Sequence, residues 1–293
     1  MAKGIALSVL ASVLFAVMYF YTSLLAPLGG VEIFGWRMLL TLPCMTLFML
    51  LSGEWSRVGE VLQRVRHKPL LGLALLLSSA LVGVQLWLFM WAPLNGHSLD
   101  VSLGYFLLPL TMVLTGRIVY GERLSRLQKT ATALACLGVC NELYQVGSFS
   151  WATALVALGY PLYFILRRRL GSDHLGGLWI DMALLIPVAL WVVQSGAQGI
   201  GVLAAQPRLY LLIPLLGLIS ASALVCYIIA SRALPFSLFG LLSYVEPVLL
   251  LLVALMLGES IQGGQWLTYV PIWLAVLALV LEGARHLARQ RRN

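Results

Sequence analysis

The sequence predicts an all-α, polytopic membrane protein with ten transmembrane helices arranged as two inverted five-helix repeats. Composition, the placement of basic residues and internal repetition lead to this prediction. Of the 293 residues, 61% are hydrophobic and only 10% are charged, whereas a soluble domain carries about 25% charged residues. Apolar runs of about 20 residues, each enough to cross a hydrocarbon core of roughly 30 Å, recur along the whole chain.

Helical spans are predicted wherever such an apolar run is bounded by polar or turn-forming residues. A transmembrane β-barrel would alternate apolar and polar residues, but the run LLLLVALML at 249–257 does not alternate. The first run continues to Leu25 and further spans follow it, so we interpret it as an uncleaved first helix and not as a signal peptide. The predicted spans are 4–25, 33–52, 70–92, 99–120, 127–144, 148–166, 176–195, 209–230, 235–257 and 265–284.

Nearly all basic residues lie on one side of the membrane when the chain is threaded through these ten spans. Among the 19 Lys and Arg residues, only Arg37, inside a span, and Arg208 lie outside the two terminal segments and the even-numbered loops. Positively charged loops stay in the cytoplasm. We therefore expect a bacterial inner-membrane protein with both termini cytoplasmic. The net charge of +8 follows from this distribution, so it does not indicate a nucleic-acid-binding protein.

The two halves of the chain resemble one another in sequence. At an offset of 144 residues, Tyr19 matches Tyr163, and each is followed by phenylalanine. At a similar offset, GYFLLPLTMVLTGRIVYGE at 104–122 matches LSYVEPVLLLLVALMLGE at 242–259. Each copy of this motif has a tyrosine, then a proline, then Gly-Glu at the helix end.

The matches divide the chain into an N-terminal repeat, residues 1–146, and a C-terminal repeat, residues 147–293. Each repeat holds five predicted spans. An odd number of spans places the second repeat upside down in the membrane relative to the first. Inverted repeats are typical of secondary transporters, which bind substrate near the membrane midplane between the repeats.

The Tyr–Pro–Gly-Glu motifs, the arginine of WRM at 36–38 and the ten-span layout resemble the EamA family of the drug/metabolite transporter superfamily. The stretch QLWLFMWAPLNGHSLDVSLGYFLLPL at 85–110 is similar to the RarD branch of that family. The resemblance covers nearly the whole chain. It implies export of small metabolites or drug-like compounds in exchange for protons.

Glu246 lies deepest of the charged residues inside the predicted spans, and Pro247 follows it. A charge at the bilayer centre costs about 2.5–3.5 kcal/mol on insertion scales. Proline removes a helical hydrogen bond, and unpaired backbone at membrane depth is tolerated only against protein or a polar cavity. We predict helix breaks at Pro247 and at its counterpart Pro109, and a substrate or proton site at Glu246. A carboxyl held only by packing is the alternative.

Aromatic and amide side chains are expected to line the same cavity as Glu246. They suit amphipathic, aromatic or cationic substrates through stacking and cation–π contacts. Trp and Tyr are also common at the membrane interface, which is the alternative interpretation. The candidates are Tyr244, Tyr105, Trp87, Gln85, Tyr19 and Tyr163.

Two further charges inside spans, Arg37 and Asp181, occupy equivalent positions of the two repeats. We expect Arg37 to pair with Asp100, at the outer start of the fourth span. The expected partner of Asp181 is Arg117, Arg126 or Arg232. We interpret such a pair as a static ion pair that locks the helix ends, and a gate that breaks and reforms during transport is the alternative.

The motifs do not indicate an enzyme, since HExxH and GxSxG are both missing from the sequence. The cysteines lie inside apolar runs, and we interpret them as buried thiols. We expect no cofactor, no metal site and no nucleic-acid partner. The expected partners are a small-molecule substrate, protons as the coupling ion and the bilayer, for a monomer or weak homodimer. An uptake permease for an amino acid or similar metabolite is the alternative function, and an integral-membrane enzyme is disfavoured.

Overall fold

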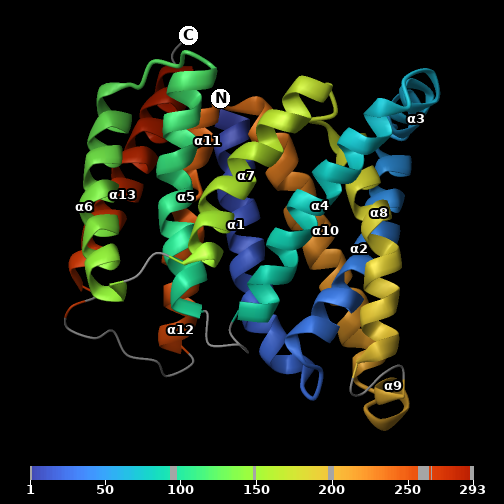
Figure 1. Cartoon of the computed structure of the whole chain (residues 1–293). Helices are drawn as coiled ribbons and strands as arrows, with labels where there is room; N and C mark the ends of the chain where they lie inside the picture. The colour runs from blue at the N-terminus through green and yellow to red at the C-terminus, as the bar shows by residue number, and fades with distance from the viewer. Residues whose placement is uncertain are drawn as a thin grey trace. The chain divides into compact units, whose positions relative to one another are not determined.

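The computed structural model describes residues 2–92, 98–147, 150–196, 201–256, 264 and 266–290. This part of the chain is built from helices and turns (Figure 1). Within it, five helical segments are long and apolar enough to cross a membrane. Shorter apolar helical segments at Leu103–Val119, Phe236–Leu249 and Trp266–Leu281 accompany them. The protein is a polytopic membrane protein of the all-α class.

A helix occupies each of the ten predicted spans, because a chain in lipid must satisfy its backbone polar groups internally. These helices are α1 (Ala2–Thr22), α2 (Gly30–Leu51), α4 (Leu70–Trp91), α5 (Ser98–Val119), α6 (Arg126–Val146), α7 (Trp151–Leu170), α8 (Leu175–Ser195), α10 (Leu209–Ala233), α11 (Phe236–Leu242) with α12 (Val245–Met256), and α13 (Trp266–Gln290). Short helices lie in three connections: η1 (Ser23–Leu25), α3 (Ser56–His67) and α9 (Val202–Ala205).

Local sequence sets both ends of α6. At its start, the Ser125 hydroxyl accepts a hydrogen bond from the Gln128 backbone N–H, and the Gln128 side chain accepts one from the Ser125 N–H, both at 3.1 Å. This reciprocal pair is a capping box. At the other end, Gly147 adopts a left-handed conformation with φ of 67° and its N–H donates to the Leu143 carbonyl. A residue with a Cβ would be strained there.

The helices pack as two compact units. Unit 1 comprises Met1–Ala16, His97–Pro161 and Ile229–Asn293, and unit 2 comprises Val17–Gly96 and Leu162–Ile228. Both units draw helices from both halves of the chain, and α1, α7 and α10 contribute to each. The predicted boundary at residues 146 and 147 concerns the repeats and not these packing units, and it stays a prediction.

In unit 1, α6 packs lengthwise against α13, and α5 packs against α11 (Figure 1). A Cβ added to Gly138 would lie 2.6 Å from the Thr268 carbonyl oxygen, so glycine is needed for the close approach of α6 and α13. Asn141 donates to the Thr268 hydroxyl at 2.8 Å, and that hydroxyl donates to Glu142 Oε2 at 2.9 Å. This polar chain joins the two helices where apolar packing alone would leave the buried Glu142 carboxylate without a donor.

Two cysteines of α6 differ from the expectation. Cys136 and Cys140 are exposed, whereas Cys44 and Cys226 are partly buried. The prediction of buried thiols is therefore wrong for Cys136 and Cys140. An apolar run in a membrane protein can face lipid as well as protein, because lipid tails and apolar side chains are similar environments.

In unit 2, α8 packs against α2 and α4. Gly35 lies at the contact with α8, where an added Cβ would be 2.8 Å from Val193 Cγ2 and 3.1 Å from the Ala189 carbonyl oxygen. Such distances are too short for ordinary packing. Glycine at this position thus allows α2 and α8 to approach closely.

Gly35→Ala is expected to destabilise the protein, since overpacking a dense contact costs about 1–3 kcal/mol. The matched control is Gly59→Ala in α3, where nothing lies within 4 Å of the added methyl group. Alanine stabilises a helix relative to glycine by about 0.5–1 kcal/mol, so this control should unfold at the same or a higher temperature than the wild type. Thermal unfolding in detergent measures both, and equal melting temperatures for G35A and the wild type would contradict the packing argument.

Candidate functional site

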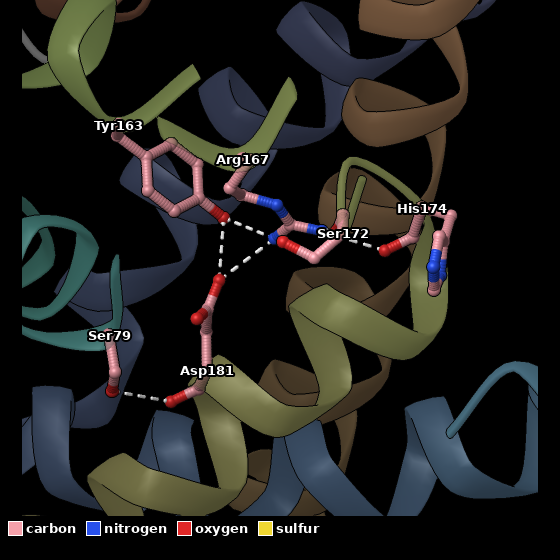
Figure 2. Close-up of polar contacts among 6 residues, drawn as sticks. All are labelled: Ser79, Tyr163, Arg167, Ser172, His174 and Asp181. Carbon is pink, nitrogen blue, oxygen red and sulfur yellow. Dashed lines mark hydrogen bonds and ion pairs between the residues drawn. The ribbon is translucent and has the colours of Figure 1, made fainter. Parts of the chain in front are cut away.

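A cluster of buried polar groups in unit 2 surrounds Arg167, near the C-terminal end of α7 (Figure 2). Arg167 NH1 donates to Asp181 Oδ2 at 2.8 Å and to the Tyr163 hydroxyl at 2.5 Å. The Tyr163 hydroxyl in turn donates to Asp181 Oδ2 at 3.0 Å. The Arg167 and Asp181 side chains are each only 1% exposed. The result is a desolvated ion pair whose two members both form a hydrogen bond with the same tyrosine hydroxyl.

The same guanidinium also fixes the turn between α7 and α8. Its NH2 donates to the carbonyl oxygens of Ser172 and His174, the latter at 2.7 Å. From α4, the Ser79 hydroxyl donates to the backbone carbonyl of Asp181 at 2.8 Å (Figure 2). Further hydrogen bonds offset part of the cost of burying an ion pair, although Arg167 Nε and Asp181 Oδ1 have no hydrogen-bond partner among the described residues. The cluster therefore ties α4, α7, α8 and one turn together.

The sequence predicts Arg117, Arg126 or Arg232 as the partner of Asp181, and this prediction is wrong. Its partner is Arg167, which the sequence groups with two neighbouring arginines as a basic loop. In the structure α7 continues through Leu170, so Arg167 is helical and turns inward. Arg167 follows Tyr163 by four residues, and this i, i+4 spacing was the available signal that both lie on one helix face.

Arg37 is a second buried arginine of unit 2, with 2% exposure. Its Nε donates to the Ser220 hydroxyl of α10 at 2.9 Å. Asp100 lies in the first turn of α5 in unit 1, where its backbone carbonyl accepts a hydrogen bond from the Thr153 hydroxyl at 2.8 Å. The pairing of Arg37 with Asp100 joins residues of different units and stays a prediction.

In unit 1, the ninth predicted span is divided at Ser243 and Tyr244, between α11 and α12. Pro247 has no N–H, and the Ser243 carbonyl accepts a hydrogen bond from the Glu246 N–H at 3.2 Å instead. Glu246 occupies the first turn of α12 and is half-buried. The break expected from Pro247 is thus present, and Glu246 lies directly beside it.

Pro109 differs from its counterpart, since α5 continues through it from Ser98 to Val119. The expectation of a broken helix at Pro109 is therefore wrong. Pro109 leaves the carbonyl of Tyr105 without its helical donor, and side-chain hydroxyls bind two other carbonyls that precede the proline. The fully buried Tyr244 hydroxyl donates to the Phe106 carbonyl at 2.8 Å, and the Thr111 hydroxyl donates to the Leu108 carbonyl at 2.8 Å. Such hydrogen bonds let a transmembrane helix accommodate proline.

The other predicted lining residues fall in both units. Tyr105 is half-buried in α5 of unit 1. In unit 2, α4 carries the buried Gln85 and the half-buried Trp87, while Tyr19 is 37% exposed and meets Phe89 edge-on at 6.2 Å between ring centroids. Their convergence on one cavity stays a prediction.

Glu122 has a role that the sequence did not reveal. Its carboxylate accepts hydrogen bonds from the backbone N–H groups of Phe236 at 2.6 Å and Ser237 at 2.8 Å. These are the first two residues of α11, so Glu122 caps that helix from the end of α5. Glu122 belongs to the first Gly-Glu motif. The recurrence of that motif in the sequence was the available signal that this glutamate has a structural role. The second Gly-Glu, at 258–259, lies outside the described residues.

Glu122→Ala is expected to lower the free energy of unfolding by about 0.5–2 kcal/mol, the usual cost of losing an N-terminal cap. Glu60→Ala, at an exposed position of α3, is the control for loss of one carboxylate. Thermal unfolding in detergent measures the difference. An E122A protein that unfolds together with E60A and the wild type would argue against the cap.

The sequence is similar to those of known transporters. Residues 2–141 match the EamA-like transporter family. The chain is 45% identical to the chloramphenicol-sensitive protein RarD of Pseudomonas aeruginosa, over 99% of this chain and 98% of that protein. It is 41% identical to an uncharacterized transporter of Pasteurella multocida, over 99% of both chains.

A solved protein structure with 17% sequence identity has the same fold, with a TM-score of 0.69 over 96% of this chain and 98% of that one. Protein RarD of Streptomyces exfoliatus is 31% identical over 92% of this chain and 85% of that protein. These relationships place the chain among transporters and not among enzymes. With its membrane helices and its full-length similarity to RarD, the chain belongs to the EamA-like transporter family.

Proposed function

We propose that the protein is an inner-membrane secondary transporter that exports small amphipathic metabolites or drug-like compounds by alternating access, in exchange for protons. The observation that carries this proposal is the break between α11 and α12, with Glu246 in the first turn after it. Interrupted helices form substrate and ion sites in secondary transporters. Ionisable residues inside membrane spans commonly mark proton pathways. Glu246 would bind a proton or a cationic substrate in turn.

Packing inside each unit supports ten spans in two inverted repeats. Helices at equivalent positions of the repeats pack together: α2 with α8, α5 with α11, and α6 with α13. The buried polar contacts are reciprocal as well. Arg37 of α2 contacts Ser220 of α10, and Asp181 of α8 contacts Ser79 of α4. If the two repeats are exchanged, the contact of α2 with α10 becomes the contact of α8 with α4, as two-fold pseudosymmetry requires.

The two predicted gate pairs differ in what supports them. The Arg167–Asp181 pair is bound to Tyr163 and to two turn carbonyls as well, and all of these bonds would have to break for it to open. This network suits a permanent brace at one end of α7 and α8. Arg37 with Asp100 remains the proposed gate, on the outer side of a protein whose termini are cytoplasmic.

Flux measurements in proteoliposomes, with and without an imposed proton gradient, test the proposed function. Chloramphenicol, which appears in the name of the Pseudomonas aeruginosa relative, is the first compound to try, and amino acids form the comparison set. We expect protein-dependent movement of the drug-like compound in the direction opposite to the proton gradient. Inward movement of an amino acid without any flux of drug-like compounds would support the uptake permease instead.

A further inference from the structure

The helix α3 (Ser56–His67) connects α2 to α4, two helices that are long and apolar enough to cross a membrane. It therefore lies at the membrane surface, and it packs against α8 and α4 near their ends (Figure 1). Val58 and Val61 form its buried stripe, with exposures of 2% and 1%. The rest of the helix is rich in charge, as expected for an amphipathic helix in the interfacial layer.

One flank of α3 is held by the protein. Arg64 NH2 donates to the Leu170 carbonyl at 2.6 Å, and NH1 donates to the Gly171 carbonyl at 3.2 Å. These carbonyls end α7, and the next carbonyls along the same turn, at Ser172 and His174, are bound by the buried Arg167. Two arginines thus bind carbonyl oxygens of the turn between α7 and α8, Arg64 from the surface and Arg167 from the interior.

The opposite flank of α3 is exposed. With about 100° of rotation per residue, Leu62 and Arg66 lie on the side of the helix away from Arg57 and Arg64, and Glu60 lies on a third side. Leu62 is 49% exposed, and Arg66 and Lys68 are exposed. Throughout the described ranges, the side chains of Arg66 and Lys68 take part in no hydrogen bond or ion pair.

An exposed apolar side chain on the same side of α3 as one unpaired cation, with a second cation at the residue that follows the helix, matches the chemistry of an anionic phospholipid at the level of the headgroups. The acyl chain can pack on Leu62, while Arg66 and Lys68 reach the headgroup phosphate, as basic residues do at membrane surfaces. We propose that Leu62, Arg66 and Lys68 form a binding surface for anionic phospholipid, and that its occupation strengthens the hold of α3 on the turn between α7 and α8. Binding to the folded state stabilises that state by mass action.

Native mass spectrometry of the full-length protein in detergent, with added phosphatidylglycerol or phosphatidylcholine, measures lipid binding at this surface. The wild type is expected to retain phosphatidylglycerol in preference to phosphatidylcholine. The double variant R66Q/K68Q should bind phosphatidylglycerol about 25-fold more weakly, since each basic residue near an anionic surface contributes about fivefold. Inorganic phosphate should not displace the lipid, because it offers nothing for Leu62 to contact.

The matched control is R123Q/K129Q, which removes two exposed positive charges, one from the connection between α5 and α6 and one near the start of α6. It should bind phosphatidylglycerol as the wild type does. A second measurement, the melting temperature in nanodiscs, should rise with phosphatidylglycerol for the wild type and for R123Q/K129Q but not for R66Q/K68Q. Three results would overturn the proposal: equal retention of the two lipids by the wild type, equal loss in both variants, or displacement by inorganic phosphate.

Discussion

Asp181→Ala is expected to lower the free energy of unfolding by about 3–5 kcal/mol, because it leaves the guanidinium of Arg167 buried without its carboxylate. Both side chains are 1% exposed in the intact pair, so bulk solvent does not compensate for the lost carboxylate. The Tyr163 hydroxyl loses its acceptor in the same change. Thermal unfolding in detergent should show a large drop in melting temperature.

Two further variants make this stability test specific. Arg169→Met, two residues from Arg167 but exposed, is the control and should stay within about 0.5 kcal/mol of the wild type. The double variant R167M/D181L should be less destabilised than the two single changes added together, because it buries no unpaired charge. It should not recover fully, since methionine cannot bind the Ser172 and His174 carbonyls. Near-normal stability of D181A would show that the ion pair is dispensable.

Glu246→Gln is expected to abolish transport driven by a proton gradient, reducing it to the level of protein-free liposomes. Glutamine keeps the size of the side chain but cannot gain or lose a proton at physiological pH. Exchange of substrate between compartments of equal pH should persist, because that reaction needs no net proton movement. Flux of the same substrate with and without the gradient separates the two reactions.

Glu142→Gln is the matched control for this change. Glu142 is a buried glutamate of unit 1, but it lies in α6 and accepts a hydrogen bond from Thr268. E142Q should therefore keep its dependence on the gradient even if it is less stable. Gradient-driven transport by E246Q at the wild-type rate would assign proton coupling to another group.

Much of the fold could be predicted from the sequence, because membrane helices must be long and apolar. Helices occupy all ten predicted spans, with bounds shifted by a few residues. The helix α3 was not predicted, since its only apolar stripe is Val58, Val61 and the half-buried Val65 within a charged connection. Its helical structure depends on tertiary packing against α8 and α4, which periodicity in so short a segment does not reveal.

The break next to Glu246 was expected because Pro247 removes a helical hydrogen bond. However, α2, α7, α8, α10 and α13 continue through prolines of their own, so proline alone does not decide where a helix breaks. The partner of Asp181 was not predictable in this way, because it depends on where α7 ends and which side of it Arg167 faces. Pro109 shows the same limit. Its chemistry equals that of Pro247, but α5 stays continuous around it, and the hydroxyl of Tyr244, from the turn between α11 and α12, binds the nearby carbonyl of Phe106.

Proton movement coupled to substrate is the most direct test of the proposed mechanism. Liposomes with purified protein and a trapped pH-sensitive dye would be given a substrate gradient and no initial pH difference. We expect substrate movement to drive protons in the opposite direction, for the wild type and E142Q but not for E246Q. Substrate flux through the wild-type protein without any change in internal pH would contradict proton exchange as the coupling mechanism.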